Sequence, residues 1–240
     1  MECHPVHHEA SAACTGCHRG DPRTRRLELA HRDLIAGRFA HFALPGSLVV
    51  ARGQQVLERA GCRRCHVTGG RGNGLATDLD QLLQGATPAE TMGALQQPAL
   101  FMPRFALTEP ATVELVNALY AGSAGAPRRT GETPVVVHFE QAAPPESAFE
   151  THCGGCHRML SRMQGGLGRG ATGPNLTGLL GEFYPGTYKD RERWTPASLR
   201  RWVMNPRDTR PLATMPPRSL PDQELERILA AFEAGGGTAR

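Results

Sequence analysis

The chain has few aromatic side chains, a single lysine and no long apolar runs. Only 5% of its 240 residues are aromatic, and Lys189 is the one lysine among 27 basic residues. No run approaches the eighteen or more apolar residues that a membrane-spanning helix needs, so we expect no transmembrane helix. Arginine carries almost all of the positive charge behind the formal net charge of +4, and no basic run alternates with aromatic residues. This pattern argues against binding to nucleic acid.

Cysteine and histidine, in contrast, recur in a fixed arrangement. The pentapeptide Cys-x-x-Cys-His occurs at 14–18, 62–66 and 153–157. Its two thiols lie one helical turn apart and form thioethers with the two vinyl groups of one haem, and the adjoining histidine binds the iron. The motif residues are Cys14, Cys17, His18, Cys62, Cys65, His66, Cys153, Cys156 and His157. We therefore expect at least three covalently attached c-type haems, each with the histidine of its motif as the proximal iron ligand.

Paired cysteines also occur in four-thiolate zinc sites and in thioredoxin-like redox centres. Neither kind of site requires a histidine directly after the second cysteine, yet a histidine follows all three pairs. A shared zinc site would leave one pair without a partner, and nothing around the motifs resembles a parallel-sheet unit. The low aromatic content agrees with haem attachment, because a haem can replace aromatic side chains as the apolar centre of a core.

The seventh cysteine, Cys3, is followed by His4. A cysteine just upstream of Met1 would complete a fourth haem motif, so we hypothesise that Met1 is an internal methionine and that the protein carries three or four haems. A free or lipid-bearing cysteine is the alternative. Haem attachment to this motif takes place on the outer side of a bacterial membrane, whereas the sequence opens without an export signal. We expect the protein on the periplasmic or cell-surface side, with membrane association through a lipid anchor or a complex.

Composition and periodicity divide the chain into four parts. Residues 1–45 are rich in histidine and arginine with little apolar periodicity, so this haem-binding segment is predicted to be irregular and ordered by haem packing. Residues 46–122 are predicted to form a helix, a haem motif, a loop and a closing helix, and 123–145 to form a linker. Residues 146–240 repeat the order of 46–122, which indicates an internal duplication. The predicted fold is mainly α.

Apolar stripes at helical spacing mark the helices around the second and third motifs. The stripe residues are Val49, Gly53, Val56, Leu57 and Ala60 before the second motif, Val113, Val116, Leu119 and Tyr120 after it, and Leu225, Ile228, Leu229 and Phe232 near the C-terminus. Thr108 is the expected N-cap of the second of these helices, and Gly122 is expected to end it.

The region 146–240 resembles class I cytochrome c across almost all of its length. The resemblance lies in the order of a short helix, the haem motif, Gly-Pro-Asn-Leu at 173–176, a tryptophan segment, Met-Pro at 215–216 and a terminal helix. It implies that the carbonyl of Pro174 accepts a hydrogen bond from the ring N–H of the proximal histidine. Trp202 matches a tryptophan that is often found near the haem edge in this family.

The same resemblance implies distal iron ligands. Met215 is expected opposite His157, and Met102 opposite His66, because a proline follows each methionine. The second module matches less completely, since its loop at 72–75 reads Gly-Asn-Gly-Leu and lacks the proline. Glycine carbonyls of that loop are the candidate replacement for the contact to the proximal histidine.

The N-terminal segment resembles the histidine-rich segments of multihaem cytochromes from metal-reducing bacteria, in which a distal histidine follows the haem motif. His31 is the first candidate for this distal ligand, and His7 or His8 is the second; His4 would bind the iron of a fourth haem. The whole arrangement resembles exported cytochromes, some of them lipoproteins, that are encoded with systems for extracellular electron transfer or for selenite and tellurite reduction.

The function expected of the haems follows from the number of protein ligands on each iron. If every iron has two protein ligands, no coordination position is open to a substrate, and the haems only accept and pass electrons. We expect an electron carrier, not an enzyme, that transfers single electrons between redox partners such as other cytochromes. Two-histidine ligation in the N-terminal segment and histidine–methionine ligation in the modules predict unequal potentials. The alternatives are a dihaem peroxidase or small oxyanion reductase with one open iron position, and the haem subunit of a larger electron-transfer complex.

Overall fold

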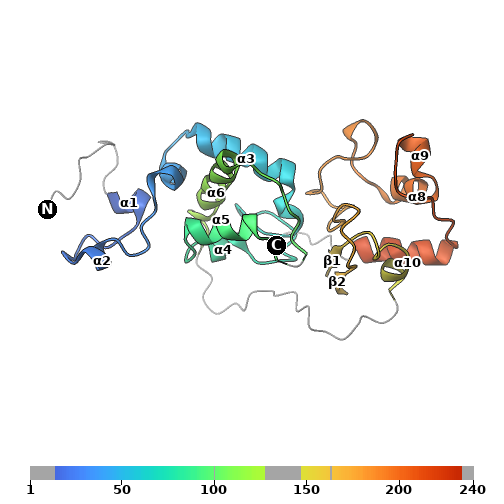
Figure 1. Cartoon of the computed structure of the whole chain (residues 1–240), viewed down its shortest axis with the longest axis horizontal. Coiled ribbons are helices and arrows are strands. Elements are labelled where there is room, and N and C mark those ends of the chain that lie inside the picture. The colour runs from blue at the N-terminus through green and yellow to red at the C-terminus, as the bar shows by residue number, and fades with distance from the viewer. Residues whose placement is uncertain (1–13, 100, 128–146, 163, 234–240) are drawn as a thin grey trace.

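A computed structural model describes residues 14–99, 101–127, 147–162 and 164–233. These residues are mainly helical, and they form an N-terminal segment, a central module and a C-terminal module in a row along the longest axis (Figure 1). Within the described ranges, no helix is both long and apolar enough to cross a membrane. The sequence-based expectations for Cys3, His4, His7, His8 and most of the linker lie outside the described residues.

The N-terminal segment contains short helical elements. They are α1 (Cys14–His18), α2 (Leu27–Ala30) and the 3-10 helix η1 (Gly37–Ala43). Ile35, Phe39 and Ala40 are buried, and they pack with Val56 and Leu115 in the core of the central module. The second half of the segment is therefore ordered by ordinary core packing and not by haem packing alone, which the sequence analysis did not predict.

Two crossing helices frame the central module. Its elements are α3 (Leu48–Ala60), η2 (Cys62–Arg64), α4 (Leu79–Leu82), α5 (Pro88–Gln96) and α6 (Glu109–Ser123). Gly53 lies where α3 crosses α6, and a β-carbon on it would stand 1.9 Å from the carbonyl oxygen of Glu114. Ser47 caps the start of α3, and Gly61, in the left-handed conformation at φ 64°, ends it directly before the second haem motif.

The limits of α6 test two predictions. Thr108 is its N-cap, because its side chain accepts a hydrogen bond from the amide of Ala111. The predicted end at Gly122 is wrong, because the helix continues to Ser123. A β-carbon on Gly122 would lie 3.1 Å from the hydroxyl oxygen of Thr68, so this glycine permits close packing against a loop and does not terminate the helix.

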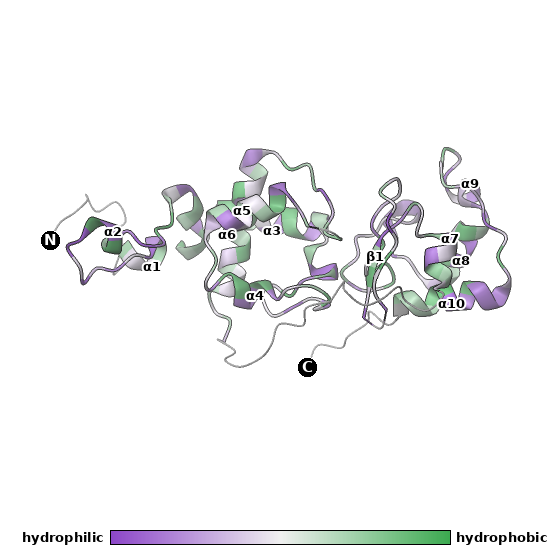
Figure 2. Ribbon diagram, turned by 60° about the horizontal axis from the view of Figure 1, so that its bottom comes forward, coloured by the Kyte–Doolittle hydropathy of each residue, from purple (hydrophilic) through white to green (hydrophobic). Residues whose placement is uncertain are grey.

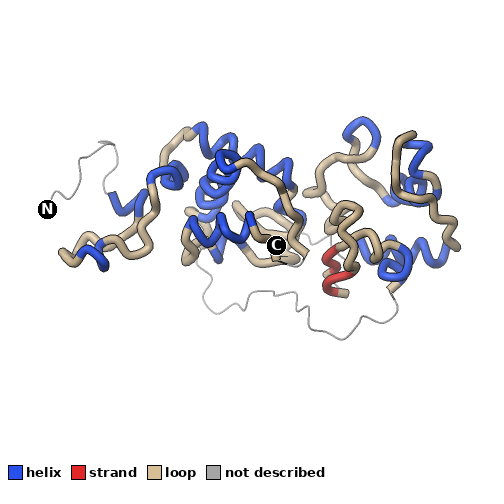
Figure 3. Tube along the Cα trace, in the orientation of Figure 1, coloured by secondary structure: helices blue, strands red, loops and turns tan. Residues whose placement is uncertain are grey.

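The C-terminal module repeats the pairing of an initial and a final helix. Its elements are α7 (Ala148–His152), β1 (Met159–Ser161), β2 (Gly165–Leu167), η3 (Lys189–Arg191), α8 (Pro196–Met204), α9 (Pro206–Thr209) and α10 (Asp222–Glu233). The two strands form a small antiparallel sheet (Figure 3). Phe149 of α7 is fully buried and meets Phe232 of α10 edge to face, with 6.0 Å between the ring centroids. The predicted stripe along α10 is confirmed, and Figure 2 shows hydrophobic and hydrophilic residues alternating on it.

A shared backbone feature supports the internal duplication. Gly72 and Gly168 both have positive φ, at 142° and 78°. A β-carbon on either glycine would lie about 2 Å from the carbonyl oxygen of a motif histidine, His66 or His157. In both modules the chain therefore returns directly over the backbone of its haem motif, at a point where only glycine fits.

Candidate haem-binding sites

All three motif histidines make the same contact. In each, the ring nitrogen Nδ1 lies 2.8 Å from a backbone carbonyl oxygen. The pairs are His18 with Ile35, His66 with Thr77, and His157 with Pro174. When Nδ1 carries the proton and donates it to the carbonyl, Nε2 is left as the basic atom that binds iron, and the ring orientation is fixed. Among the described residues, the six cysteines of the three motifs form no disulfide.

Acceptor carbonyls are predicted from sequence for two of the three histidines, and the structure has one of the two. The contact between His157 and Pro174 is the one that the resemblance to cytochrome c implies. In the central module, Thr77 supplies the acceptor and the glycines of 72–75 do not. Those residues run back along the motif itself, where the amide of Leu75 donates to the carbonyl of Cys65 at 2.8 Å. The loop therefore approaches the imidazole ring of His66 only at Thr77, two residues after Leu75.

The central module encloses an apolar cavity of about 740 Å³. Cys62, Cys65, His66 and Met102 all lie in its wall. The other lining residues include Leu79, Leu83, Ala86, Leu95, Phe101 and Leu119. The volume lies within the range of cofactor cavities, and two thiols, an imidazole and a thioether in one apolar wall are the groups that hold a c-type haem. The residues present therefore fit this cofactor.

Burial shapes the chemistry of the same wall. It lowers the pKa of His66, because the charged imidazolium loses hydration, and this favours the neutral form that binds a metal. Burial also raises the pKa of Cys62 to about 11. The free thiol therefore stays protonated at neutral pH, and thioether formation removes this ionisation entirely.

In the C-terminal module, Cys153 and Met215 pack against one hydrophobic cluster built around Phe149. The indole Nε1 of Trp202 donates a hydrogen bond to the sulfur of Met215 at 3.0 Å, and its ring meets Trp194 edge to face. Trp202 therefore contacts the expected distal ligand itself. The resemblance to cytochrome c implies a position near the haem edge for this tryptophan, and the contact with the sulfur is an additional finding of the structure.

At Gly173 the backbone lies directly against the imidazole ring of His157, the expected proximal ligand of the third site. A β-carbon on Gly173 would lie 2.2 Å from Cε1 of His157. Only a glycine allows the chain to run along the face of the imidazole and then present the Pro174 carbonyl to Nδ1. The close approach to the His157 ring therefore explains why a glycine precedes Pro174 in this module.

The first site lies against the central module. Cys17 packs on the core of that module, whereas Cys14 is exposed. The amide of Asp21 donates to the carbonyl of Ala30 at 3.1 Å, so the segment that carries His31 folds back beside the motif. This segment also exposes apolar side chains, namely Leu27, Leu29 and Leu34. Exposed leucines beside a haem motif fit a site whose apolar surface a macrocycle would cover.

Arg19 joins this first motif to the cavity of the central module. It directly follows His18, and its guanidinium donates to the carbonyls of Leu83 and Ala86, both at 3.0 Å. Both acceptors belong to residues that line the cavity. The guanidinium also lies over the ring of Tyr120, 5.5 Å from its centroid. The first two candidate sites are therefore held together by an arginine beside a proximal histidine.

Comparison with known proteins agrees with the C-terminal site. The family described as cytochrome c oxidase, cbb3-type, subunit III has a model that matches residues 140–230. No curated protein and no solved structure matches the chain. This family match supports a c-type cytochrome module at residues 140–230, and such modules carry covalently attached haem c and exchange electrons with redox proteins.

Proposed function

We propose that the chain is a multihaem c-type cytochrome that passes single electrons between redox proteins on the periplasmic or cell-surface side of a bacterial membrane. The common geometry of the three motif histidines carries this proposal, because each ring is oriented by a carbonyl at 2.8 Å. An isolated Cys-x-x-Cys-His match has no reason to show this contact, whereas a histidine that binds a metal almost always donates its other ring N–H in this way. Haem, when bound, supplies a one-electron iron couple.

The residues divide into attachment and ligation roles. The cysteine pairs hold the macrocycles by thioether bonds, and His18, His66 and His157 present Nε2 to the irons. Met102 and Met215 serve as distal ligands in the two modules. For the N-terminal haem, His31 is the first candidate and His7 or His8 the second. Cys3 and His4 would belong to a fourth haem.

A substitution at Met102 tests the ligation and separates a carrier from an enzyme. With two protein ligands on every iron, the reduced protein should not bind carbon monoxide. Met102→Ala should open one coordination position, so that the reduced variant binds one carbon monoxide per chain. Met92→Ala is the matched control, because Met92 packs on the core and does not belong to the cavity wall. Carbon monoxide binding by the unsubstituted protein would favour a haem enzyme instead.

The matched family favours a second candidate function. Its description names a subunit of an oxidase, and residues 140–230 are similar to it. The chain would then act as the haem subunit of a larger electron-transfer complex. Size-exclusion chromatography of a native extract distinguishes the two, because a free carrier elutes at the 25.9 kDa of the chain plus its haems, and a subunit elutes with its complex.

A further inference from the structure

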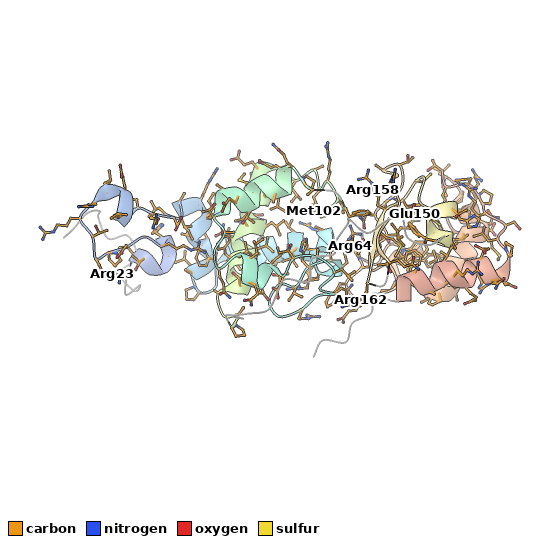
Figure 4. All side chains as sticks on the ribbon, turned by 90° about the horizontal axis from the view of Figure 1, so that it is seen from below. Arg23, Arg64, Met102, Glu150, Arg158 and Arg162 are labelled. Carbon is orange, nitrogen blue, oxygen red and sulfur yellow. The ribbon has the colours of Figure 1, made fainter. Side chains whose placement is uncertain are left out.

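The central and C-terminal modules are joined by direct hydrogen bonds. Arg64 of the central module donates through Nη1 to the carbonyl of Asn175 at 2.9 Å. The side-chain amide of Asn175 donates to the carbonyl of Phe101 at 2.8 Å, and Arg162 donates to the carbonyl of Asn73 at 2.7 Å. Figure 4 shows Arg64 and Arg162 where the ribbons of the two modules meet. Donors from both modules therefore hold the boundary.

On the central side, two of these three hydrogen bonds involve residues next to the expected haem-binding residues. Arg64 lies inside the haem motif and directly precedes Cys65. Phe101 directly precedes Met102, and both line the cavity. Leu160 of β1 also lies in this cavity wall and packs against Cys65. The C-terminal module thus closes part of the central haem site.

On the C-terminal side, the dipeptide Pro174–Asn175 contacts residues of both candidate sites. The carbonyl of Pro174 accepts from Nδ1 of His157, and the carbonyl of the next residue, Asn175, accepts from Arg64. Two consecutive carbonyls therefore contact the proximal ligand of the third site and the attachment motif of the second. A path of bonds therefore runs from Cys65 through Arg64, Asn175 and Pro174 to His157. Apart from these two hydrogen bonds, all of its links are covalent.

The contact is buried. Arg64 is only 8% exposed, and its guanidinium lies over the ring of Tyr184, 5.2 Å from the centroid. The hydroxyl of Tyr184 donates to the same Asn175 carbonyl at 3.2 Å. A charged donor in such a shielded position makes a stronger and better oriented hydrogen bond than a surface arginine. A transient contact between two protein surfaces would not hold an arginine in such a buried position.

We propose that Arg64 and the Pro174–Asn175 dipeptide form the junction through which the second and third haem sites exchange electrons. This inference rests on the proposed function. In each event one iron is oxidised by one electron and the other is reduced by one, and no proton or atom moves. Arg64 is a positioning residue in this junction: it holds the two modules in register and completes the bonded path between their ligands.

The test uses the full, haem-loaded chain and two readouts. Amide hydrogen exchange of residues 173–177 reports whether the junction is closed, independently of electron transfer. Partial photoreduction by a soluble flavin, followed optically, reports electron redistribution between haems; the intramolecular phase has a rate that does not depend on protein concentration. Arg64→Ala should raise the exchange and slow this phase several-fold, with the haem count and potentials retained.

Two further variants sharpen the result. Arg64→Lys keeps a cationic donor, so it should recover a large part of the intramolecular rate and should fold even if the alanine variant does not. Arg59→Ala is the control, because Arg59 lines the same cleft between the modules and its side chain makes no hydrogen bond within the described part of the chain. It should change neither readout.

The outcomes separate the junction from the proposed function. An intramolecular rate that is unchanged in Arg64→Ala would overturn the junction. The junction would also fail if the unsubstituted protein carries several haems but shows no concentration-independent phase, while the multihaem function would stand. A single haem per chain would overturn both. A slowed phase in Arg64→Ala with near-normal rates in Arg64→Lys and Arg59→Ala would support the junction.

Discussion

At the scale of single residues, the candidate haem sites share an arrangement of backbone carbonyls and glycines around the histidine rings. Side chains supply the ligands, but Ile35, Thr77 and Pro174 act only through their main-chain oxygens. A hydrogen bond of this kind fixes which ring nitrogen carries the proton and raises the basicity of the other. The positions of these carbonyls thus set the orientation of each motif histidine.

Gly173 gives the sharpest test at this scale. In Gly173→Ala the new methyl group would lie 2.2 Å from Cε1 of His157, so the ring must move and its hydrogen bond to Pro174 must break. We expect the reduction potential of one haem to shift while the others stay unchanged, measured by potentiometric titration. Gly155→Ala, inside the same motif, is the control, because a β-carbon there meets no atom within 4 Å. Identical titration curves for all three proteins would refute this role.

At the scale of secondary-structure elements, each module rests on one pair of packed helices around its haem motif. The apolar stripes allowed these helices to be predicted, because a helix that faces a core must repeat its apolar residues every three or four positions. The same rule could not reveal η1, since a 3-10 helix of seven residues has no such stripe. Its residues Phe39 and Ala40 nevertheless reach the core of the central module.

As with the helices, only part of each candidate site could be predicted from the sequence. The Cys-x-x-Cys-His motifs and the Met-Pro pairs have distinctive side chains, so the ligand candidates could be named from sequence. Carbonyl acceptors such as Ile35 and Thr77 could not, because every residue carries a carbonyl and only the fold decides which one faces a ring. The contact from Arg64 to Asn175 was equally hidden, since it joins residues 111 positions apart.

The helix pair of the C-terminal module predicts a large loss of stability on one substitution. Phe149→Ala removes a fully buried ring that packs edge to face on Phe232. It should lower the free energy of unfolding by about 3–5 kcal/mol. Denaturant titration followed by fluorescence reports this module alone, because both tryptophans of the chain lie in it. Leu212→Ala, at a side chain that is 94% exposed, should change the value by less than about 0.5 kcal/mol. Equal changes in the free energy of unfolding for Phe149→Ala and Leu212→Ala would contradict this packing.

At the scale of the whole molecule, the candidate sites follow one another in a row (Figure 1). Arginines link each site to the next. Arg19 joins the N-terminal segment to the wall of the central cavity, and Arg64 joins the central module to the C-terminal one. Each arginine is adjacent in sequence to a haem-binding residue. The links between modules therefore start beside the candidate haem-binding residues.

Arg19→Ala should loosen the N-terminal segment. The substitution removes two hydrogen bonds, to the carbonyls of Leu83 and Ala86, and the contact over the Tyr120 ring. Limited proteolysis should therefore cut within residues 14–34 faster than in the unsubstituted protein, while the central module persists. Arg25→Ala, at an exposed position in the same segment, should leave the cleavage rate unchanged. Equal rates for the two variants would show that Arg19 does not hold the segment.

The number of haems per chain tests the multihaem function most directly. Intact mass together with a pyridine haemochrome assay, on protein matured in a host that attaches haem c, counts the covalently bound macrocycles. We predict at least three, with the count falling by one when both cysteines of any one motif are replaced by alanine. A count of one, lost only when Cys153 and Cys156 are replaced, would show that the first two motifs are not haem sites and would contradict the proposed function.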